Sequence, residues 1–525
     1  MYFGKTWTTG QSMTRRFTIT TPIFYVNGAP HIGHAYTSIA CDVIARFHRL
    51  DGNDVLFVSG TDEHGQKVEQ SAKAQNMPPQ EFADRISQSF RQMQKDMAVQ
   101  TDEFIRTTEA RHKKAAQTLW EKVAESGHIY LDAYEGWYST RDEMFVGEDE
   151  ITTHPDGSRT APSGAPLEWV REPSYFFRLS EFQDRLLKLY EENPDFIGPH
   201  GPKREIISFV KQGLRDLSIS RTSFRWGVEV PGDPDHVMYV WFDALANYLT
   251  AVGYPDMKDP RHVHWPADVH VVGKEIIRFH CIYWPAFLMA AGLPLPKRVF
   301  AHGWWTVEGE KMSKSLGNVL DPKALADEFG LDQLRFFLMR EVPFGGDSNF
   351  SRRSLITRMN VELANDLGNL AQRTLSQVAR NLEGVLPERG TLTEDDEKIL
   401  AQATLLPDLT RNHIERLAIS DALEDIWKLI REANAYIDRQ APWVLKKENP
   451  ARMADVLRVL VDVIRAVATL LQPYMPDTMA KMLDQLGVEE GERHLAALET
   501  PLPGGRTLPK PQGLFPRFVE EEKQA

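Results

Sequence analysis

Short apolar runs and longer helical stretches alternate over the first 300 residues. The run 17–25 is rich in β-branched and aromatic residues and predicts a strand. Asn27, Gly28 and Pro30 mark the turn that follows, and residues 35–50 are expected to form one helix. Further strands are predicted at 54–60, 104–108, 268–275 and 298–303. This alternation predicts an α/β fold with a doubly wound parallel sheet.

The pattern changes twice along the chain. From about residue 120 to 225, short strand-like pieces alternate with turn-rich stretches, which indicates an insertion into the α/β domain. Beyond residue 358 the pattern is almost wholly helical, because apolar residues recur at helical spacing in 363–382, 423–437 and 457–471. The C-terminal third is therefore predicted to be a helix bundle.

Composition narrows the class of protein. A chain of 525 residues has room for about three domains. Its net charge of -13 argues against nucleic-acid binding when taken alone, but a total charge says nothing about a single basic face. Cys41 and Cys281 both lie in apolar sequence, which favours a reducing compartment. No signal-peptide core and no long apolar run are evident, so we expect a cytoplasmic protein without a membrane span.

A histidine turn stands at the start of the first predicted helix, in the sequence His31-Ile32-Gly33-His34. Unpaired backbone N–H groups and the helix dipole favour phosphate at this place. His31 and His34 are three residues apart, so both can donate to one phosphate group, and Gly33 lets a flat ring lie against the backbone. Two ordinary surface histidines at a helix start are the alternative.

A lysine loop lies 280 residues further on, in the sequence Lys311-Met312-Ser313-Lys314-Ser315. Its lysines and serines can close over a polyphosphate, although a solvated basic turn is the alternative. In this order, each after a predicted strand, the two motifs resemble the two signatures of class I aminoacyl-tRNA synthetases. The resemblance implies that His31, His34, Lys311 and Lys314 stabilise the transition state in which pyrophosphate leaves ATP.

The flanking segments resemble the methionyl members of that class. Asp62, at the end of a predicted strand, is a candidate to hold an amino group, or alternatively caps the next helix. Aromatic rings suit a flexible thioether, and His280 and Tyr25 could hydrogen-bond its sulfur, although an aromatic stripe at helical spacing is also typical of plain core. The resemblance implies a methionine pocket of Ile23, Tyr25, Asp62, Trp241, Leu245, Tyr248, Phe279, His280 and Trp284.

The nucleotide is expected beside the same sheet edge. Gly273 allows close approach of a nucleoside, and Glu275 could accept hydrogen bonds from ribose hydroxyls. A helix is predicted over 276–289. The full set expected to bind ATP, with Mg²⁺ as its counterion, is His31, Gly33, His34, Gly273, Glu275, Trp305 and Lys314.

Three residues in the helical third are candidates to read unpaired bases. Asn369 and Arg373 are four apart on one helical face, and Trp443 follows a helix end. Ordinary surface residues and a core tryptophan are the alternative. The resemblance implies that all three contact the CAU anticodon of the tRNA for methionine, elongator and initiator alike.

The insertion lacks the cysteine pairs that hold zinc in many relatives. Ser139 and Asp142 stand where cysteines are expected, and serine is a poor zinc ligand, so we predict no metal site. An aromatic minicore is expected instead, of Tyr134, Trp137, Tyr138, Trp169, Tyr175 and Phe176. Arg221, where the insertion ends, could supply a cation to the active site or could be an exposed charge.

The resemblance implies a methionine–tRNA ligase with a Rossmann-type catalytic domain. We expect the catalytic halves at 13–119 and 226–300, the insertion at 120–225, the lysine loop and a stem-contact region at 301–358, the anticodon-binding bundle at 359–500 and a Pro- and Gly-rich tail at 501–525. Met13 is a candidate natural start. No further tRNA-binding barrel follows the bundle, which favours a monomer.

Three alternative functions can be weighed against this one. Synthetases for leucine, isoleucine or valine need a larger editing insertion, and the cysteine enzyme needs zinc-binding cysteines. A catalytically silent tRNA-binding protein has no need of His31, His34, Lys311 and Lys314. A small nucleotidylyltransferase shares the histidine turn but does not account for the helical third.

Overall fold

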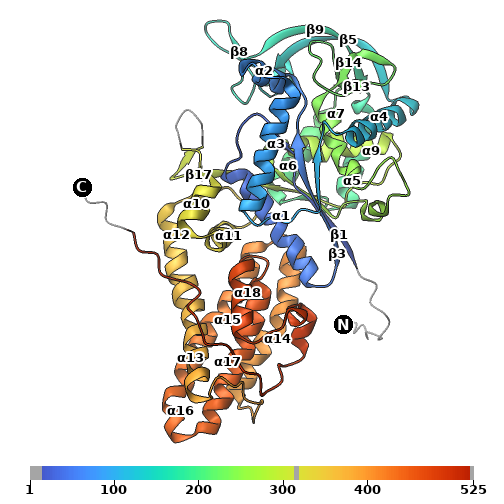
Figure 1. Cartoon of the computed structure of the whole chain (residues 1–525). Coiled ribbons are helices and arrows are strands. Elements are labelled where there is room, and N and C mark those ends of the chain that lie inside the picture. The colour runs from blue at the N-terminus through green and yellow to red at the C-terminus, as the bar shows by residue number, and fades with distance from the viewer. Residues whose placement is uncertain (1–14, 143, 313–317, 521–525) are drawn as a thin grey trace, which may run out of the picture.

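A seven-stranded parallel sheet forms the centre of the catalytic domain (Figure 1). The computed structural model describes residues 15–142, 144–312 and 318–520. The strand order is β10-β16-β15-β1-β3-β2, and β4 also pairs with β3. The strands are β1 (Arg16–Thr20), β2 (Phe24–Tyr25), β3 (Asp54–Asp62), β4 (Glu103–Arg106), β10 (Ile197–Gly198), β15 (Val269–Gly273) and β16 (Val299–His302).

The first predicted strand is divided in two. Pro22 lies between β1 and β2, and proline cannot donate to a strand ladder. After this break, Tyr25 pairs with Asp62 at the end of β3, while Thr20 pairs with His270 on β15. The carboxyl ends of these strands thus gather residues from positions 20 to 270 at one sheet edge.

Helices cover the sheet and connect its strands. Helix α1 starts at the histidine turn, as predicted, and packs against β1, β3 and β15. The predicted helix 276–289 is instead a 3₁₀ turn, a π-helical segment and a short α-helix. Such π segments often accompany functional sites. The helices are α1 (Ile32–Leu50), α2 (Gln66–Ala74), α3 (Pro79–Asp96), α4 (Ala110–Glu125), α7 (Val240–Leu245), α8 (Asn247–Thr250), η4 (Lys274–Ile276), η5 (Phe279–Tyr283) and α9 (Trp284–Ala290).

The insertion lies at the end of the molecule opposite the bundle (Figure 1). Its largest element is the antiparallel pair β5 (Ile129–Ser139) and β9 (Glu168–Phe177), which leads into α5 (Gln183–Glu192) and α6 (His200–Lys211). The aromatic minicore differs from the prediction. Trp137 packs on Val146, Ala161, Ala165 and Leu167, whereas Trp169 is 49% exposed and meets Trp137 edge-on.

The remaining members of the predicted minicore take different places. Tyr138 is buried, Tyr175 packs edge-on against Trp120, and Phe176 stacks on Tyr130. The side chain of Tyr134 lies outside the described residues. The aromatic residues therefore serve two cores, because β5 and β9 extend from the catalytic domain into the insertion.

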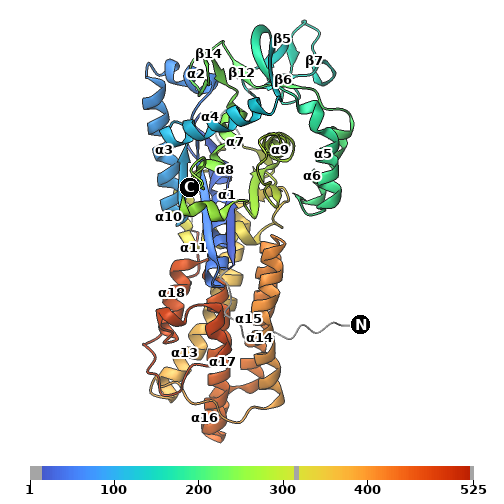
Figure 2. The ribbon, with the colours of Figure 1, turned by 90° about the vertical axis from the view of Figure 1, so that its right-hand side faces the viewer.

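The C-terminal third is the predicted helix bundle, which Figure 2 shows from the side. Together with the sheet domain, it confirms the predicted fold class. The helices that lead to the bundle and form it are α10 (Pro322–Phe329), α11 (Leu331–Arg340), α12 (Arg352–Arg358), η6 (Met359–Gly368), α13 (Asn369–Asn381), α14 (Glu394–Glu415), α15 (Ile419–Gln440), α16 (Pro442–Glu448), α17 (Pro450–Leu471) and α18 (Pro476–Gln485).

One fully buried arginine joins the catalytic domain to the bundle. Arg335 on α11 donates to the Asp42 carboxylate on α1 at 2.7 Å, to the Met97 carbonyl, and to the carbonyls of Pro473 and Tyr474 between α17 and α18. A buried charge needs such complete pairing. Both parts also share one continuous hydrophobic core.

The Pro- and Gly-rich segment after residue 501 is not a loose tail in its described part. It runs back along the bundle, where the Leu386 N–H donates to the Arg506 carbonyl and the Phe518 N–H donates to the Asn360 side chain. Phe518 also packs against Phe329 on α10. In the described ranges, no helix is both long and apolar enough to cross a membrane.

Candidate active site

The histidine turn is a reciprocal cap on α1. The His31 Nδ1 accepts a hydrogen bond from the Gly33 N–H, and the His34 Nδ1 accepts one from the His31 N–H, both at 3.1 Å. Each ring therefore carries its proton on Nε2, and the two rings lie 3.9 Å apart. This arrangement aims two Nε2 donors from one helix start, as phosphate binding requires.

The flat ring beside Gly33 is that of His31. A Cβ atom at Gly33 would lie 3.0 Å from the His31 ring, so a side chain there would displace it. Burial, with a smaller contribution from His31, holds the pKa of His34 well below its ordinary value of 6.5. His34 is therefore neutral at pH 7 and acts as a hydrogen-bond donor rather than as a cation.

The segment after the lysine loop lies against the histidine turn. The Ile32 N–H donates to the Leu320 carbonyl at 3.1 Å, and Met312 packs against the same core as α1. Before the loop, β17 (Trp305–Val307) pairs with β18 (Glu310–Lys311) and β19 (Ser348–Phe350). Lys314 and the side chain of Lys311 lie outside the described residues. The segment after the loop is thus placed beside the predicted phosphate site.

Gly273 and Glu275 form the other side of the predicted nucleotide site. A Cβ atom at Gly273 would lie 2.3 Å from the Glu275 carboxylate, so glycine is needed for this carboxylate to fold back over the chain. The Trp304 indole donates to Glu275 at 2.8 Å. Trp305, which was predicted to bind ATP, has its side chain buried against Tyr36, so only its backbone could meet a nucleotide.

Trp304 and Lys274 were missed by the sequence reasoning. Trp304 is 46% exposed, and the Lys274 ammonium lies 4.0 Å from its ring centroid and 2.6 Å from the Asp347 carboxylate. The adjacent tryptophans at 304 and 305 were the available signal, since alternation along a strand puts neighbours on opposite faces. Trp304 therefore borders the predicted nucleotide site where Trp305 supports the core.

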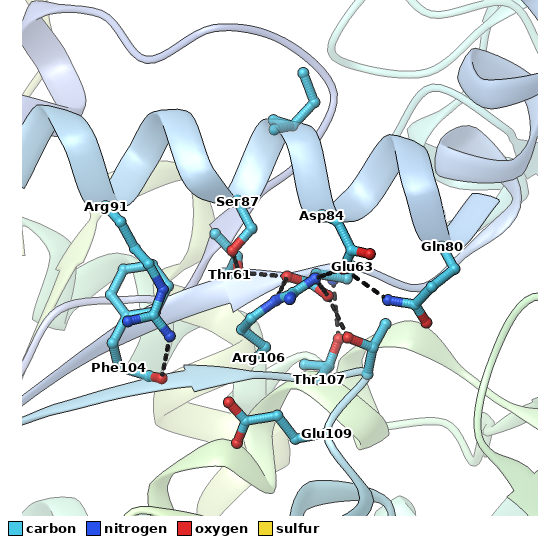
Figure 3. Close-up of polar contacts among 12 residues, drawn as sticks. Thr61, Glu63, Gln80, Asp84, Ser87, Arg91, Phe104, Arg106, Thr107 and Glu109 are labelled. Carbon is cyan, nitrogen blue, oxygen red and sulfur yellow. Dashed lines mark hydrogen bonds and ion pairs between the residues drawn. The ribbon is translucent and has the colours of Figure 1, made fainter. Parts of the chain in front are cut away.

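Asp62 ends β3 next to a dense polar network on the other face of the strand (Figure 3). The Thr61 hydroxyl donates to Glu63 at 2.7 Å, and Arg106 donates to the fully buried Glu63 through Nε at 2.7 Å and Nη2 at 3.0 Å. Because side chains alternate along a strand, Asp62 faces away from Thr61. Helix α2 is capped at Gly65, so the alternative role for Asp62 as its cap is wrong.

The predicted methionine pocket comes together as an aromatic cup. Trp241 stacks on Phe279 with ring centroids 3.7 Å apart and planes 5° apart. Tyr248 stacks on His270 at 4.0 Å, and the Trp284 indole donates to the His270 Nε2 at 3.3 Å. The cup therefore assembles rings from α7, α8, β15, η5 and α9, as a site for a thioether needs.

The two ring nitrogens of His280 already have protein partners. Nδ1 lies 3.0 Å from the Ile276 carbonyl, and Nε2 lies 2.7 Å from the Tyr248 hydroxyl. Nδ1 must therefore carry the proton, and Nε2 accepts from Tyr248. Burial lowers the pKa of His280 to about 4, so the ring is neutral at pH 7. A hydrogen bond from His280 to a substrate sulfur would require one of these bonds to be exchanged.

Leu245 and Ile23 are the aliphatic members of the predicted methionine pocket. Leu245 is buried on α7, and Tyr25 and Trp241 both pack against the hydrophobic cluster that contains it. Ile23 lies over Gly60, where a Cβ atom would be 2.8 Å from its Cγ2.

Arg221 is neither exposed nor free to move. It is buried between the rings of Tyr138, Phe145 and Tyr239, and it donates to the Ser218 hydroxyl at 2.9 Å and to the Ser220 carbonyl at 2.6 Å. The alternative of an exposed charge is wrong. Arg221 instead fastens the insertion to the catalytic domain, which the linear sequence could not reveal.

Hydrogen bonds connect the residues at the expected zinc-ligand positions. The Ser139 hydroxyl donates to the Asp142 carboxylate at 2.9 Å and accepts from the Asp142 N–H, and Ser163 also donates to Asp142. Among the described residues, no group of three or more His, Cys, Asp or Glu side chains is placed to hold a metal.

Two of the three candidate anticodon residues meet at the far end of the bundle. Arg373 on α13 lies 5.3 Å above the Trp443 ring and donates to Asp438 at 2.6 Å. Trp443 is the second residue of α16 and is 45% exposed, so it is not a core tryptophan. Asn369 is exposed one turn before Arg373. An exposed indole, a guanidinium and an amide suit the stacking and reading of unpaired bases.

Comparison with known proteins agrees with this geometry. Residues 17–375 match the family model of class I tRNA synthetases (M), and residues 386–525 match that of the anticodon-binding domain of methionyl tRNA ligase. The chain is 54% identical over 510 residues to the methionine–tRNA ligase of Brucella suis, covering 97% of this chain and 99% of that one. It is 54% identical over 511 residues to the methionine–tRNA ligase of Rickettsia felis, covering 96% and 99%.

A solved structure extends the similarity to three dimensions. The Mycobacterium tuberculosis methionyl-tRNA synthetase in complex with methionyl-adenylate is 51% identical, with a TM-score of 0.94, over 96% of this chain and 100% of that one. The apo form of the Mycobacterium tuberculosis enzyme gives a TM-score of 0.88 at 47% identity, over 98% of this chain and 100% of that one. This chain therefore belongs to the methionyl-tRNA synthetases, a family of class I aminoacyl-tRNA synthetases.

Proposed function

We propose that this chain is a methionine–tRNA ligase, which activates methionine with ATP and then transfers it to the 3′-terminal adenosine of tRNA. The observation that carries the proposal is full-length similarity to methionine–tRNA ligases, one of which is solved with methionyl-adenylate. The contact between the histidine turn and the segment after the lysine loop, together with the stacked rings of the aromatic cup, supports it.

In the first step the methionine carboxylate attacks the α-phosphate of ATP, and pyrophosphate leaves. The carboxylate is already ionised, so no general base is needed, and catalysis rests on positioning and charge stabilisation. The Nε2–H groups of His31 and His34 donate to the phosphates, and Lys311 and Lys314 neutralise the charge that develops on pyrophosphate. Mg²⁺ enters with ATP as part of the substrate.

Recognition of methionine divides between charge and shape. The Asp62 carboxylate binds the ammonium group, and the rings of Trp241 and Phe279 hold the thioether. Gly273, Glu275 and the Trp305 backbone bind the nucleoside. The 2′-hydroxyl of the terminal tRNA ribose then attacks the adenylate, while Asn369, Arg373 and Trp443 bind the CAU anticodon of elongator and initiator tRNA.

Three further properties belong to the proposal. We expect a cytoplasmic monomer that uses no zinc. The hydrogen bonds of Ser139, Asp142 and Ser163 support the last point, since they connect the residues that stand in the expected ligand positions.

The proposal is tested by ATP–pyrophosphate exchange with each of the twenty amino acids. We expect exchange with methionine, and exchange at least 100-fold slower with leucine or isoleucine, because neither offers a polarisable sulfur to the cup. Transfer to a tRNA transcript with a CAU anticodon is measured in parallel. Exchange driven by a different amino acid would refute the specificity, and tRNA binding without exchange would refute the catalytic role.

A further inference from the structure

A carboxylate buried between two histidines lies beneath the aromatic cup. Asp243 accepts from the His64 Nδ1 at 2.6 Å and from the His112 Nε2 at 2.7 Å, and all three residues are at most 1% exposed. A buried ionised carboxylate needs such partners, because it has lost its hydration.

The members of this triad belong to the two halves of the predicted methionine site. His64 follows Asp62 by two residues, at the end of β3. Asp243 lies on α7 between Trp241 and Leu245, which belong to the cup. His112 lies on α4, and its Nδ1 is 3.0 Å from the Thr250 hydroxyl on α8. Asp243 thus connects the segment that carries the ammonium-binding carboxylate to the helix that carries the rings.

The same segment is held from its other side. Glu63 is fixed by Thr61 and Arg106, and its N–H donates to the Thr107 hydroxyl at 2.9 Å (Figure 3). The Trp226 indole donates to the Glu63 carbonyl at 2.6 Å and packs edge-on against the His64 ring. With Glu63 held toward β4 and His64 held toward α7, little freedom remains for the backbone of Asp62 between β2 and this anchor.

Stability alone does not account for the arrangement. The His64 Nε2 is buried and, within the described part of the chain, has no hydrogen-bond partner. An unsatisfied buried polar atom destabilises the fold, and such atoms in native proteins often mark functional regions. An apolar side chain at position 64 would avoid that cost but would lose the bond to Asp243.

We propose that Asp243, with His64 and His112, is a positioning residue that fixes the distance between the Asp62 carboxylate and the aromatic cup. The inference rests on the proposed methionine site. A substrate held at both its ammonium and its thioether is sensitive to this distance, and a displacement of about 1 Å can cost up to about 100-fold in rate. A ligand held at only one of the two groups is not.

The test compares two variants of His64 in pyrophosphate exchange. His64→Leu removes the donor to Asp243 at similar volume and is expected to raise the KM for methionine about tenfold, with the KM for ATP within about twofold. His64→Asn keeps a side-chain N–H near the position of Nδ1 and is expected to restore the KM for methionine to within about threefold of wild type. If His64→Leu does not fold, His112→Leu with His112→Gln as its rescue replaces the pair.

Two control variants separate the outcomes. Asp102→Asn removes the charge of a carboxylate that accepts a hydrogen bond from the Phe57 N–H on β3. This variant should lower thermal stability without changing the KM for methionine. Asp62→Ala tests the site itself. An unchanged KM for methionine in Asp62→Ala would overturn the proposed site, whereas a raised KM there with an unchanged KM in His64→Leu would overturn only the positioning role.

A ligand pair gives a readout that simple destabilisation would not move. Methioninol has both the ammonium and the thioether, and 4-(methylthio)butan-1-ol lacks the ammonium. In wild type we expect methioninol to inhibit exchange at a lower concentration than its amine-free counterpart. In His64→Leu the inhibitory concentration of the amine-free ligand divided by that of methioninol should fall at least fivefold. An unchanged ratio, with both ligands weakened equally, would show a structural role and overturn the proposal.

Discussion

The two ends of the molecule present their functional side chains in opposite ways. At the sheet edge three rings are buried, and Tyr248 hydrogen-bonds His280 and stacks on His270. At the far end of the bundle Trp443 is 45% exposed, and Arg373 is held by the charge of Asp438. A small substrate demands a shape set by packing, whereas unpaired bases need a surface on which to stack.

The difference extends to the ionisable groups of the two regions. In the catalytic domain, burial lowers the pKa of His48 and of His280 to about 4. In the bundle, burial raises the pKa of Asp396, but hydrogen bonds from Arg452, the Thr393 N–H and Tyr436 outweigh it and lower the value to about 2. His48 and His280 thus stabilise the fold as neutral rings and Asp396 stabilises it as an ionised carboxylate, so their responses to acid should differ.

The largest expected effect is acid destabilisation through the buried histidines of the catalytic domain. Below pH 6.5 the unfolded chain protonates His48 and His280 while the folded chain does not, so stability is lost as pH falls from 6.5 to 4. At pH 5 the loss is about 2 kcal/mol for each histidine. Asp396 stabilises the bundle above pH 3.8, and this contribution is lost only as pH falls toward 2.

Differential scanning calorimetry at pH 7 and pH 5 measures the acid effect. Because both parts share one core, we expect a single unfolding transition that moves to lower temperature at pH 5. His48→Asn should reduce the shift, because it removes one of the titrating groups. An equal shift in His48→Asn and wild type would contradict the prediction.

The next largest effect is expected at the histidine turn. His34→Asn keeps a side-chain acceptor for the His31 N–H but removes the Nε2 donor, so the cap survives while a phosphate contact is lost. Exchange should slow about 100-fold in kcat, because a donor aimed at developing charge is worth that order. The KM for methionine and the thermal midpoint should stay near wild type, and a large fall in the midpoint would assign His34 a structural role instead.

The smallest of these effects is expected at the anticodon end, where a substitution should slow tRNA charging but not pyrophosphate exchange. Trp443→Ala removes the exposed ring under Arg373 and should lower kcat/KM for tRNA charging about tenfold, since stacking of one base is worth about 1–3 kcal/mol. Pyrophosphate exchange should not change. Lys428→Ala, which removes an exposed charge ten positions before Asp438 on α15, is the control. An equal loss of tRNA charging and pyrophosphate exchange would contradict the assignment of Trp443 to tRNA binding.

The sequence predicted local features more accurately than distant ones. The start of α1 at the histidine turn follows from residues within a few positions of each other, and the structure has it within three residues of the prediction. By contrast, Trp305 was predicted at the nucleotide, but its indole is buried and its neighbour Trp304 borders the site. Which of two adjacent rings faces the core depends on β19, more than 40 residues away.

The sequence by itself determined the strand and helix pattern, the fold class, the two signature motifs and the residue types around a thioether. These features depend on residues that are close together in the sequence, where spacing along one helix or strand decides which side chains share a face. Only the tertiary structure decided that His280 gives both its nitrogens to the protein, that Arg221 is buried, and that Asp243 joins His64 to His112. The contacts of Tyr248 with His280, and of Asp243 with His64 and His112, join segments that are far apart in the sequence. Packing of the whole domain brings such segments together, so the residues near one position do not reveal its distant partner.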